Sequence, residues 1–251
     1  MHAILLAAGR GKRLSAANGT GQPKCLLSFG GHSLLARHLD LLQAAGVQRL
    51  TIVTGFEAGQ IHAAVKHLGL KLAVDFVHNE GFLLGSVLSV HCAQAVLAGA
   101  QEDVLVMDAD VLYDQRILAP LCAGPSADRI PFDTGFTPGD EPVKLCLQAG
   151  RIVEFRKRVA LALRYDTVGE TIGFFRLRPA TARRFAALVA SYVADGRADQ
   201  PHEEALRDLF LETPAGFEVL DTAPAPWLEI DFPEDLVRAR DVIVPQLQAL
   251  P

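Results

Sequence analysis

Short apolar runs alternate with longer segments of helical periodicity along the first half of the chain. The runs that predict buried strands are Ala3–Ala8, Arg49–Thr54, Lys71–Val77 and Asp103–Met107. The segments that predict helices are Ser33–Ala45, Glu57–His67 and Ser86–Leu97. Ser33 is a favourable N-cap and Gly46 a typical stop for the first of these helices. Because strands that alternate with helices usually pair in parallel, the pattern predicts a parallel sheet with helices on both faces.

The pattern changes after about Leu121, where prolines and glycines interrupt the chain and predict an irregular stretch. Farther on, a hairpin that turns at Ala149 and Gly150 is predicted from two strand-like runs, Val143–Gln148 and Arg151–Phe155. The remaining predicted elements are strand Thr171–Arg176, helices Ala180–Val193 and His202–Leu211, strands Phe217–Leu220 and Trp227–Ile230, and a terminal helix that begins at Pro233. We therefore expect residues 1–251 to form one α/β domain with a β-rich lid inserted at about residues 122–178.

The composition limits the class of protein. Half of the 251 residues are hydrophobic and 21% are charged, which excludes a disordered chain. Lysine and arginine number 24 and acidic residues 29, so the formal charge is −5. Since the chain also has no basic block, general nucleic-acid binding is not expected. No apolar run reaches the ~18–20 residues of a membrane helix, and the first predicted strand follows Met1 closely, so we expect neither a membrane span nor a signal peptide.

The four cysteines indicate a reducing compartment. Cys25, Cys92, Cys122 and Cys146 are widely spaced, form no CxxC pair and have no histidine at metal-ligand spacing. This usage is typical of reduced, mostly buried thiols rather than of a disulfide framework. We therefore expect a cytoplasmic protein.

A glycine-rich, basic segment follows the first predicted strand. In a parallel α/β sheet the loop after a strand lies at the carboxyl edge, where ligands bind. Gly9 and Gly11 would let backbone N–H groups approach phosphate oxygens, and Lys12, Arg13 and Lys24 would supply positive charge. The segment therefore predicts a phosphate-binding loop.

Two familiar phosphate loops do not fit this segment. The dinucleotide motif GxGxxG requires a third glycine where this chain has Leu14. The nucleoside-triphosphatase loop requires Gly-Lys-Ser/Thr, but Lys24 lies between Pro23 and Cys25. The phosphate loop predicted here is therefore of another kind.

Carboxylates follow two predicted strands that are far apart in the sequence. Asp108 and Asp110 come after the fourth strand, and Asp231 lies between a late strand and the start of the last helix. Taken alone, Asp231 would fit a helix cap and Asp108 a turn residue. Carboxylates from separate strands beside a phosphate loop are also the ligands that Mg²⁺ prefers, so Asp110 and Asp231 are our metal candidates. We assign Glu234 and Asp235 a structural role in the first turn of the last helix.

The segments LAAGRGKRL and PKCLL together resemble the signature of the nucleotidyltransferases that join a nucleoside triphosphate to a phosphorylated alcohol or sugar. The resemblance is to the phosphocholine cytidylyltransferase-like branch, which includes phosphonate cytidylyltransferases, and it spans nearly the whole chain. Its further matching segments are Asn79 with Ser86–Ser89, Asp108–Asp110, Lys144, Gly169–Glu170 with Ile172–Gly173, Glu203–Leu206 and Trp227–Asp231. The chain departs from the family's pattern in the longer turn Asn18–Gln22 and at Gly85–Ser86, where relatives often carry asparagine.

The resemblance implies a fold and a set of residue roles. The fold is the three-layer, Rossmann-like α/β nucleotidyltransferase fold with a mostly parallel sheet. Arg13 and Lys24 would hold the triphosphate, Lys144 would contact the acceptor's phosphate, and Asp110 and Asp231 would hold Mg²⁺. The implied nucleotide-binding residues are Leu6, Ala7, Ala8, Gly9, Gly11, Lys12, Asn79, Gly85, Ser86 and Asp108. The implied acceptor-binding residues are Glu170, Glu203, Glu204, Trp227 and Glu229.

The function expected from these roles is Mg²⁺-dependent transfer of CMP from CTP to a small phosphorylated or phosphonylated alcohol or amine, with release of pyrophosphate. Phosphocholine and aminoethylphosphonate represent the acceptor class, because carboxylates beside an aromatic ring suit an ammonium group. A neutral polyol phosphate is the alternative acceptor. The alternative functions are a sugar-1-phosphate or molybdopterin nucleotidyltransferase and a catalytically inactive nucleotide-sensing subunit.

Overall fold

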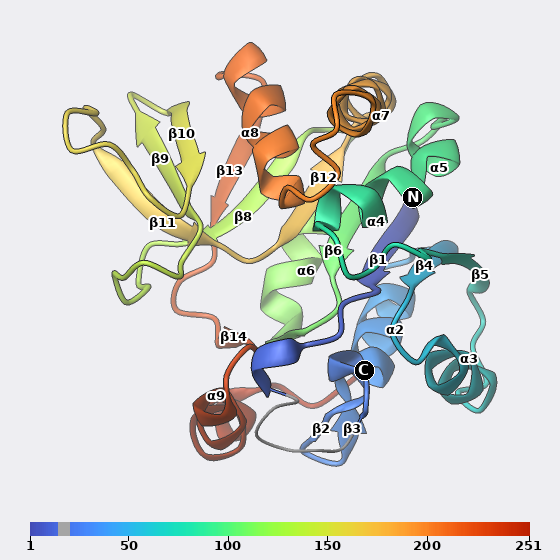
Figure 1. The fold of residues 1–251 in the computed structure, drawn as a ribbon. Helices are drawn as coiled ribbons and strands as arrows, with labels where there is room; N and C mark the ends of the chain where they lie inside the picture. Colours follow the sequence, from blue (N-terminus) through green and yellow to red (C-terminus); the bar gives the residue numbers. More distant parts are fainter. Residues whose placement is uncertain (15–20) are drawn as a thin grey trace.

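A ten-stranded sheet runs through the molecule, and the computed structural model describes it within residues 1–14 and 21–251 (Figure 1). Most of the turn Asn18–Gln22, where the sequence departs from the nucleotidyltransferase pattern, lies outside the described residues. The strands of the parallel part are β1 (His2–Ala7), β4 (Arg49–Thr54), β5 (Ala73–His78) and β6 (Val104–Asp108). The strands of the mainly antiparallel part are β8 (Arg129–Asp133), β9 (Lys144–Gln148), β10 (Arg151–Arg156), β11 (Thr167–Thr171), β12 (Phe174–Leu177) and β13 (Glu218–Asp221). The order β10-β9-β11-β8-β12-β6-β1-β4-β5, with β13 parallel to β8, makes one continuous sheet.

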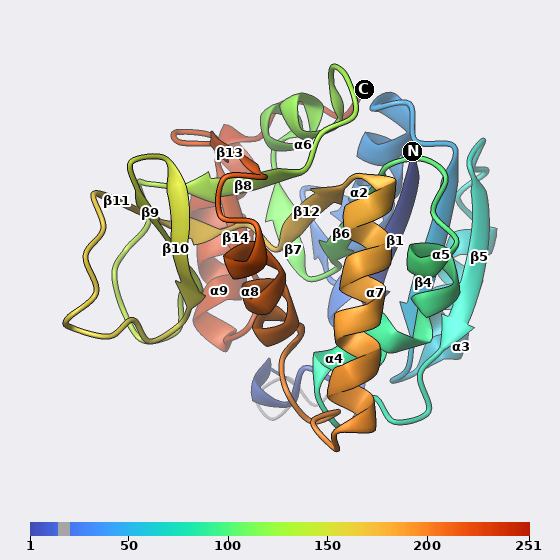
Figure 2. The same ribbon diagram turned by 90° about the horizontal axis from the view of Figure 1, so that it is seen from above.

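Helices cover both faces of this sheet, as the alternating pattern predicts (Figure 2). The helices packed in one core cluster are α2 (Leu34–Ala44), α3 (Ala58–Lys66) and α6 (Gln115–Cys122). The helices packed in the other core cluster are α4 (Ser86–Cys92), α5 (Gln94–Ala98), α7 (Pro179–Ala194) and α8 (His202–Glu212). Alternate residues of β1 enter different clusters, Ile4 one and Ala3 and Leu5 the other. The expected three-layer α/β fold is therefore confirmed.

Local signals place several of the element ends. The Ser33 side chain accepts a hydrogen bond from the Ala36 N–H at 3.1 Å, so the predicted N-cap of α2 is confirmed. Pro233 is the first residue of α9 (Pro233–Arg238), where its missing N–H costs nothing. The Asp235 carboxylate accepts hydrogen bonds from the backbone N–H groups of Asp231 and Phe232, which confirms its structural role.

Three predictions of local structure are wrong. The single helix expected at Ser86–Leu97 is two helices, because the backbone leaves helical geometry at Ala93 (φ −89°, ψ 11°). The strand expected at Thr171–Arg176 is divided between β11 and β12, because Gly173 makes a turn with a φ of 80°. The stretch expected to be irregular contains β8 despite Pro131, which lies beside Leu220 of the parallel neighbour β13.

Short elements complete the fold. A hairpin of β2 (Ser28–Phe29) and β3 (His32–Ser33) precedes α2, and a π-helical turn at Ala239–Ile243 follows α9. A separate antiparallel pair joins β7 (Val111–Tyr113) to β14 (Trp227–Glu229). The four cysteines are free thiols. Within the described residues, no helix is both long enough and apolar enough to cross a membrane.

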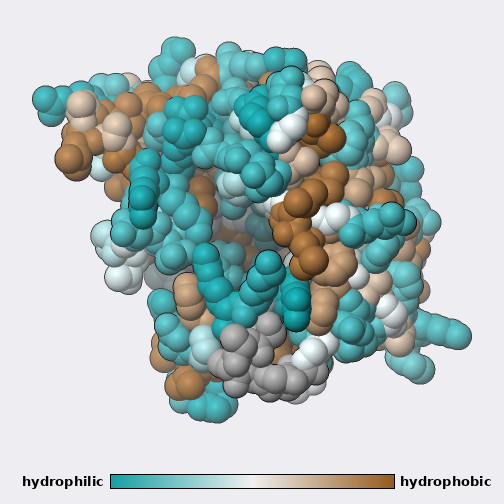
Figure 3. Space-filling model, in the orientation of Figure 1, coloured by the Kyte–Doolittle hydropathy of each residue, from teal (hydrophilic) through white to brown (hydrophobic). Residues whose placement is uncertain are grey.

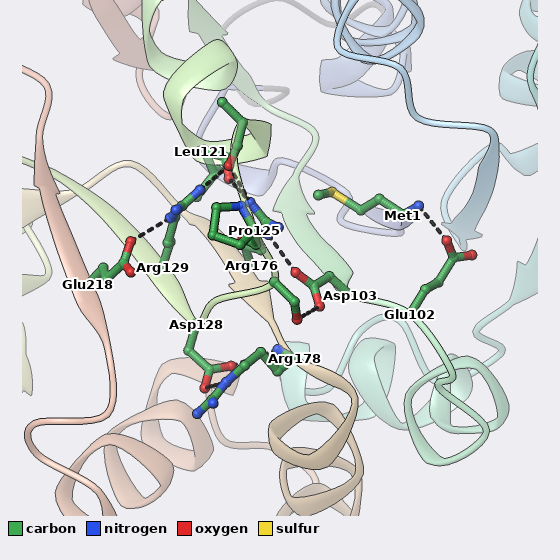
Figure 4. A network of polar contacts seen from close by, with 12 residues as sticks. Met1, Glu102, Asp103, Leu121, Pro125, Asp128, Arg129, Arg176, Arg178 and Glu218 are labelled. Carbon is green, nitrogen blue, oxygen red and sulfur yellow. Dashed lines mark hydrogen bonds and ion pairs between the residues drawn. The ribbon is translucent and has the colours of Figure 1, made fainter.

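The amino end of β6 is fastened by a buried ion pair (Figure 4). Arg176 of β12 donates from Nε to Asp103 Oδ2 at 2.7 Å, and both groups are almost fully buried. The remaining guanidinium nitrogens donate to backbone oxygens of Ala123 at 2.8 Å and Pro125 at 2.9 Å. Asp103 directly precedes β6, whose opposite end carries Asp108. The network therefore fixes the edge of the sheet that lies away from the predicted site.

Breaking this pair should destabilise the fold much more than breaking an exposed pair. Arg176→Met leaves the Asp103 carboxylate buried without its cation, so we expect a loss of about 3–5 kcal/mol in urea denaturation. Asp103→Leu added to Arg176→Met should recover part of that loss. As a control, Arg184→Met removes the exposed pair with Glu212 and should change stability little. Equal effects of the two single variants would contradict the role given to the buried pair.

Candidate active site

The chain after β1 forms a backbone-lined recess. A small cavity of about 50 Å³ is bordered by Gly9, Gly11, Lys24 and Asp110 among others. Gly11 has a φ of 61°, and a side chain there would meet Lys24, because a Cβ would lie 2.8 Å from Lys24 Cγ. Lys12 and Arg13 follow in a helical turn at residues 12–14. The predicted phosphate loop thus brings Gly9, Gly11 and Lys24 together at the carboxyl edge of the sheet.

Three carboxylates from two distant segments meet beside this loop. The antiparallel pairing of β7 with β14 continues in a hydrogen bond from the Ile230 N–H to the Asp110 carbonyl at 3.0 Å. Oxygens of Asp110, Glu229 and Asp231 lie within 4.8 Å of one another. Glu229 was assigned to the acceptor by resemblance, and the structure places it with the two predicted metal ligands. We call these three residues the carboxylate cluster.

Lys24 binds the carboxylate cluster directly. Its ammonium donates to Asp110 Oδ2 at 2.9 Å and also to Asp231 Oδ1. Burial alone would lower the pKa of Lys24, but the two carboxylates raise it above its ordinary value. Arg13 donates to the other Asp231 oxygen at 3.2 Å and lies 5.0 Å from the centre of the Phe232 ring. Two cations of the phosphate loop therefore hold one carboxylate of the distant segment.

Asp108 lies next to the cluster, in a half-buried position. Its backbone N–H donates to the Gly173 carbonyl at 3.1 Å, which fixes it at the end of β6. Desolvation by burial, followed by the charge of Asp110, raises the pKa of Asp108 well above its ordinary value. Glu229 is exposed at the rim of the cluster, and partial desolvation, followed by the charge of Asp110, also raises its pKa. The site therefore gathers four carboxyl groups, those of Asp108 and the carboxylate cluster, against the cations Lys24 and Arg13, and this arrangement favours a further cation.

The side chains of Asn79 and Ser86 fix the two ends of the loop between them. Asn79 is fully buried, and it donates to Ser89 Oγ at 3.0 Å and accepts from the Gly81 N–H at 2.9 Å. The Ser86 hydroxyl accepts from the His202 N–H at 2.8 Å and contacts His202 Nδ1 at 2.9 Å. In this structure both side chains shape the loop, and their contact with the nucleotide stays a prediction.

Lys144 is also committed to the protein. Its ammonium donates to backbone oxygens of Gly139 at 2.6 Å, Pro142 at 3.3 Å and Lys157 at 2.6 Å. An ammonium has three donors, so these contacts satisfy it. In this structure Lys144 therefore clamps two loops, and its contact with the acceptor's phosphate stays a prediction.

One cavity borders the carboxylate cluster and a larger one reaches it through Arg13, and the two cavities divide the predicted acceptor residues. Figure 3 shows a hollow in this face of the molecule, walled largely by hydrophilic side chains. The larger cavity, of about 500 Å³, is lined by Arg13, Glu203 and Glu204 among others. The second, of about 240 Å³, is lined by residues that include Glu170 and Trp227, and we call it the acidic cavity.

A chain of ion pairs separates the two cavities. Lys157 and Glu141 line both cavities and lie 3.1 Å apart, and Arg13 reaches the same Glu141 oxygen at 3.3 Å. In the larger cavity, Glu204 is already paired with Arg156, whose Nε donates to it at 3.1 Å. Sequence reasoning did not identify Glu141, because it lies in the proline-rich stretch, where no periodicity marks it.

Asp133 is a second site residue that sequence reasoning missed. It ends β8, directly across from Glu170 of β11, and it accepts a hydrogen bond from Trp227 Nε1 at 2.9 Å. Desolvation by burial, followed by the charge of Asp133, raises the pKa of Glu170 to about 7. The acidic cavity thus combines paired carboxylates with an indole ring. The sequence could have indicated Asp133 only as the last residue of a strand. Pro131 hides that strand, because proline interrupts the strand pattern.

Comparison with known proteins identifies a protein family that this chain matches. Residues 3–143 match the family model described as the MobA-like NTP transferase domain. The "Bifunctional IPC transferase and DIPP synthase" of Rubrobacter xylanophilus is 27% identical over 96% of this chain and 52% of its own length. The "CMP-5'-(3-aminopropyl)phosphonate synthase" of Streptomyces rubellomurinus is 26% identical over 94% of this chain and 37% of its own length. The chain therefore spans about half, or less, of these two curated relatives.

A relative of similar length and a solved structure extend the comparison. The "CTP:phosphoglutamine cytidylyltransferase" of Campylobacter jejuni is 24% identical, with 94% of this chain and 98% of that protein aligned. The inositol-1-phosphate CTP transferase from T. maritima superposes with a TM-score of 0.76 at 22% identity, covering 99% of this chain and 98% of that one. At that identity the structural likeness shows the fold, and it agrees with the three-layer architecture described above.

The raised pKa of Glu170 predicts a pH-dependent cost to stability. Its ordinary value is 4.5 and its folded value about 7, so ionisation disfavours the folded state increasingly between these pH values, and the penalty is complete above them. Glu170→Gln removes the penalty. We therefore compare the free energies of unfolding of the variant and the unaltered protein by urea denaturation. The gain of the variant over the unaltered protein should be larger at pH 8 than at pH 5. A difference independent of pH would show that Glu170 is not desolvated as described.

Proposed function

Because the chain belongs to the MobA-like NTP transferase family, we propose that it is a Mg²⁺-dependent cytidylyltransferase. It transfers CMP from CTP to the phosphate or phosphonate of a small acceptor that carries an amine, and it releases pyrophosphate. The observation that carries the proposal is the position of Lys24, which lies between Asp110 and Asp231 at the glycine-rich loop after β1. The names of the relatives that use CTP, phosphonates and phosphoglutamine support the choice of nucleotide and acceptor.

The chemistry requires charge neutralisation more than proton transfer. The attacking oxygen of a phosphate or phosphonate is already an anion, so no general base is needed. The barrier comes from bringing this anion to the α-phosphorus of a triphosphate, in line with the departing pyrophosphate. Lys24 and Arg13 answer that need, because both lie at the loop and carry full positive charge.

The carboxylate cluster fits a divalent cation. Its three oxygens lie within 4.8 Å of one another, and carboxylate oxygens are preferred ligands of Mg²⁺. Asp110, Glu229 and Asp231 would hold the ion, which would stabilise the negative charge that develops on the phosphates as the bond to pyrophosphate breaks. Lys24 would then be free to turn from the carboxylates to the triphosphate.

The acidic cavity fits the amine end of the acceptor. Its lining includes six carboxylates against two cations, with Trp227, Phe136 and Phe232 as aromatic faces. An ammonium or quaternary amine is attracted both by carboxylates and by the face of an aromatic ring. Glu170 is the central candidate, because it has no ion-pair partner among the described residues and faces Asp133 across the sheet.

The metal assignment predicts a loss of turnover when a ligand loses its charge. Asp110→Asn or Asp231→Asn should lower the rate of pyrophosphate release by at least ~10²-fold, because charge stabilisation by a metal is worth several kcal/mol. The matched control is Asp195→Asn, which changes an exposed carboxylate at the end of α7 and should leave the rate unchanged. Near-normal rates for either cluster variant at saturating Mg²⁺ would refute the assignment.

Metal binding without turnover gives an independent measurement for the same prediction. Lys24→Met removes the cation that now occupies the cluster, so the free protein should bind Mn²⁺ more tightly, by ~10-fold or more, in calorimetric titrations. Lys24→Arg keeps the positive charge and should show no such gain. Weaker Mn²⁺ binding by Lys24→Met would mean that the cluster does not hold the metal.

Substrate preference tests both ends of the proposed reaction. Pyrophosphate release should be at least ~10-fold faster with CTP than with ATP or GTP, when hydrogen-bonding groups select the base. Phosphocholine or aminoethylphosphonate should be preferred over an acceptor of the same length with a hydroxyl in place of nitrogen. Glu170→Gln should erase that preference, whereas Glu204→Gln in the larger cavity should retain it. Equal use of GTP would favour a different nucleotidyltransferase, and equal use of the hydroxyl acceptor would exclude an amine pocket.

A further inference from the structure

The loop between β5 and α4 is joined to the segment before α8 by backbone contacts. The Gly85 N–H donates to the Ala198 carbonyl at 3.2 Å, and the Val87 N–H donates to the Gln200 carbonyl at 3.1 Å. The approach is so close that a Cβ on Gly85 would lie 2.1 Å from the Gln200 oxygen. Two segments more than a hundred residues apart therefore run in direct contact.

A side-chain pair, Ser86 and His202, fixes this junction. Ser86 begins α4 and His202 begins α8. The Ser86 hydroxyl accepts from the His202 backbone N–H at 2.8 Å and also contacts the ring at Nδ1, 2.9 Å away. His202 is 2% exposed, and its ring meets Phe175 edge-on at 6.3 Å. The start of α4 and the start of α8 are therefore joined through one partly buried side-chain pair.

The middle of the same loop approaches the chain after β1 through Phe56, which lies between β4 and α3. The Phe56 N–H donates to the Ala8 carbonyl at 3.0 Å, and the Phe56 ring lies 6.3 Å from that of Phe82. Phe82 also packs against the core cluster that contains Ala8 and Val87. The loop therefore spans from the edge of the phosphate loop to the start of α8.

The residues that follow His202 face the larger cavity. Glu203 and Glu204 line that cavity together with Arg13 of the phosphate loop. One buried Glu203 oxygen lies 3.3 Å from His202 Nδ1 and has no hydrogen-bond partner among the described residues, so the Glu203 carboxylate packs directly beside the ring. The start of α8 is thus connected to Ser86 on one side and to the cavity on the other.

We propose that Ser86 and His202 are a positioning pair that couples nucleotide binding to the order of the cavity wall formed by the start of α8. The inference rests on the proposed function, because it takes CTP as the ligand of the loop after β1. Nucleotide that restricts the loop also restricts Ser86, and His202 passes the restriction to Glu203 and Glu204. Coupling of this kind lowers the cost of ordering the cavity wall when the acceptor enters.

Amide hydrogen exchange with and without CTP and Mg²⁺ tests the coupling. In the unaltered protein, CTP should slow exchange in peptides covering residues 3–14 and in peptides covering 198–206, the latter by ~5-fold or more. In His202→Leu and Ser86→Ala, protection of 3–14 should persist while protection of 198–206 is lost. The matched control is Ser89→Ala, which removes a hydroxyl from the same helix that contacts Asn79 rather than α8. It should keep both responses.

The outcomes separate this inference from the proposed function. Absence of CTP protection at residues 3–14 in the unaltered protein would refute CTP as the ligand of the loop. Protection there without any at 198–206, or protection of 198–206 that survives in Ser86→Ala, would overturn the coupling. Loss of the response in Ser89→Ala as well would also overturn it, because general loosening of α4 would then suffice. If His202→Leu does not fold, Ser86→Ala alone decides between these results.

Discussion

The site depends on the attraction between the Lys24 ammonium and two carboxylates that come from distant parts of the chain. Asp110 follows β6 and Asp231 follows β14, and neither would be stable beside the other without a cation between them. Two unit charges about 4 Å apart attract by roughly 4 kcal/mol near a protein surface, and desolvation offsets part of this. The ammonium therefore keeps the cluster assembled while leaving it strongly acidic.

The scaffold keeps these charges in place from both edges of the sheet. At the carboxyl edge, pairing of β7 with β14 sets Glu229 beside the end of β6 through backbone hydrogen bonds. At the opposite edge, the buried pair of Arg176 and Asp103 ties β12 to the start of β6 (Figure 4). Since β6 is held at both ends, Asp108 and Asp110 have a rigid base. A rigid base is what preorganised charge stabilisation requires.

The two parts of the sheet supply different chemistry to one cleft. The parallel part carries the phosphate loop and two of the acidic residues at its carboxyl edge, as expected for an open α/β sheet. The antiparallel part carries Asp133 and Glu170, which are two of the six carboxyl groups that line the acidic cavity. Ion pairing through Glu141 divides the cleft, so a ligand on one side meets mainly carboxylates and aromatic rings, and a ligand on the other meets mixed charge.

The sequence by itself determined the parallel part of the sheet and its covering helices, and it indicated the residues of the predicted phosphate loop, because these depend on local periodicity and on short motifs. It also indicated Asp110 and Asp231 as partners, since both follow predicted strands. Only the tertiary structure decided that Glu229 joins them, that Lys144 clamps loops, and that Ser86 is bound to His202. The strand β8 escaped prediction because Pro131 breaks the local pattern, although pairing with β13 accommodates it. Contacts between segments a hundred residues apart leave no periodic trace in the chain, and their geometry is fixed by packing and pairing that form only in the folded protein.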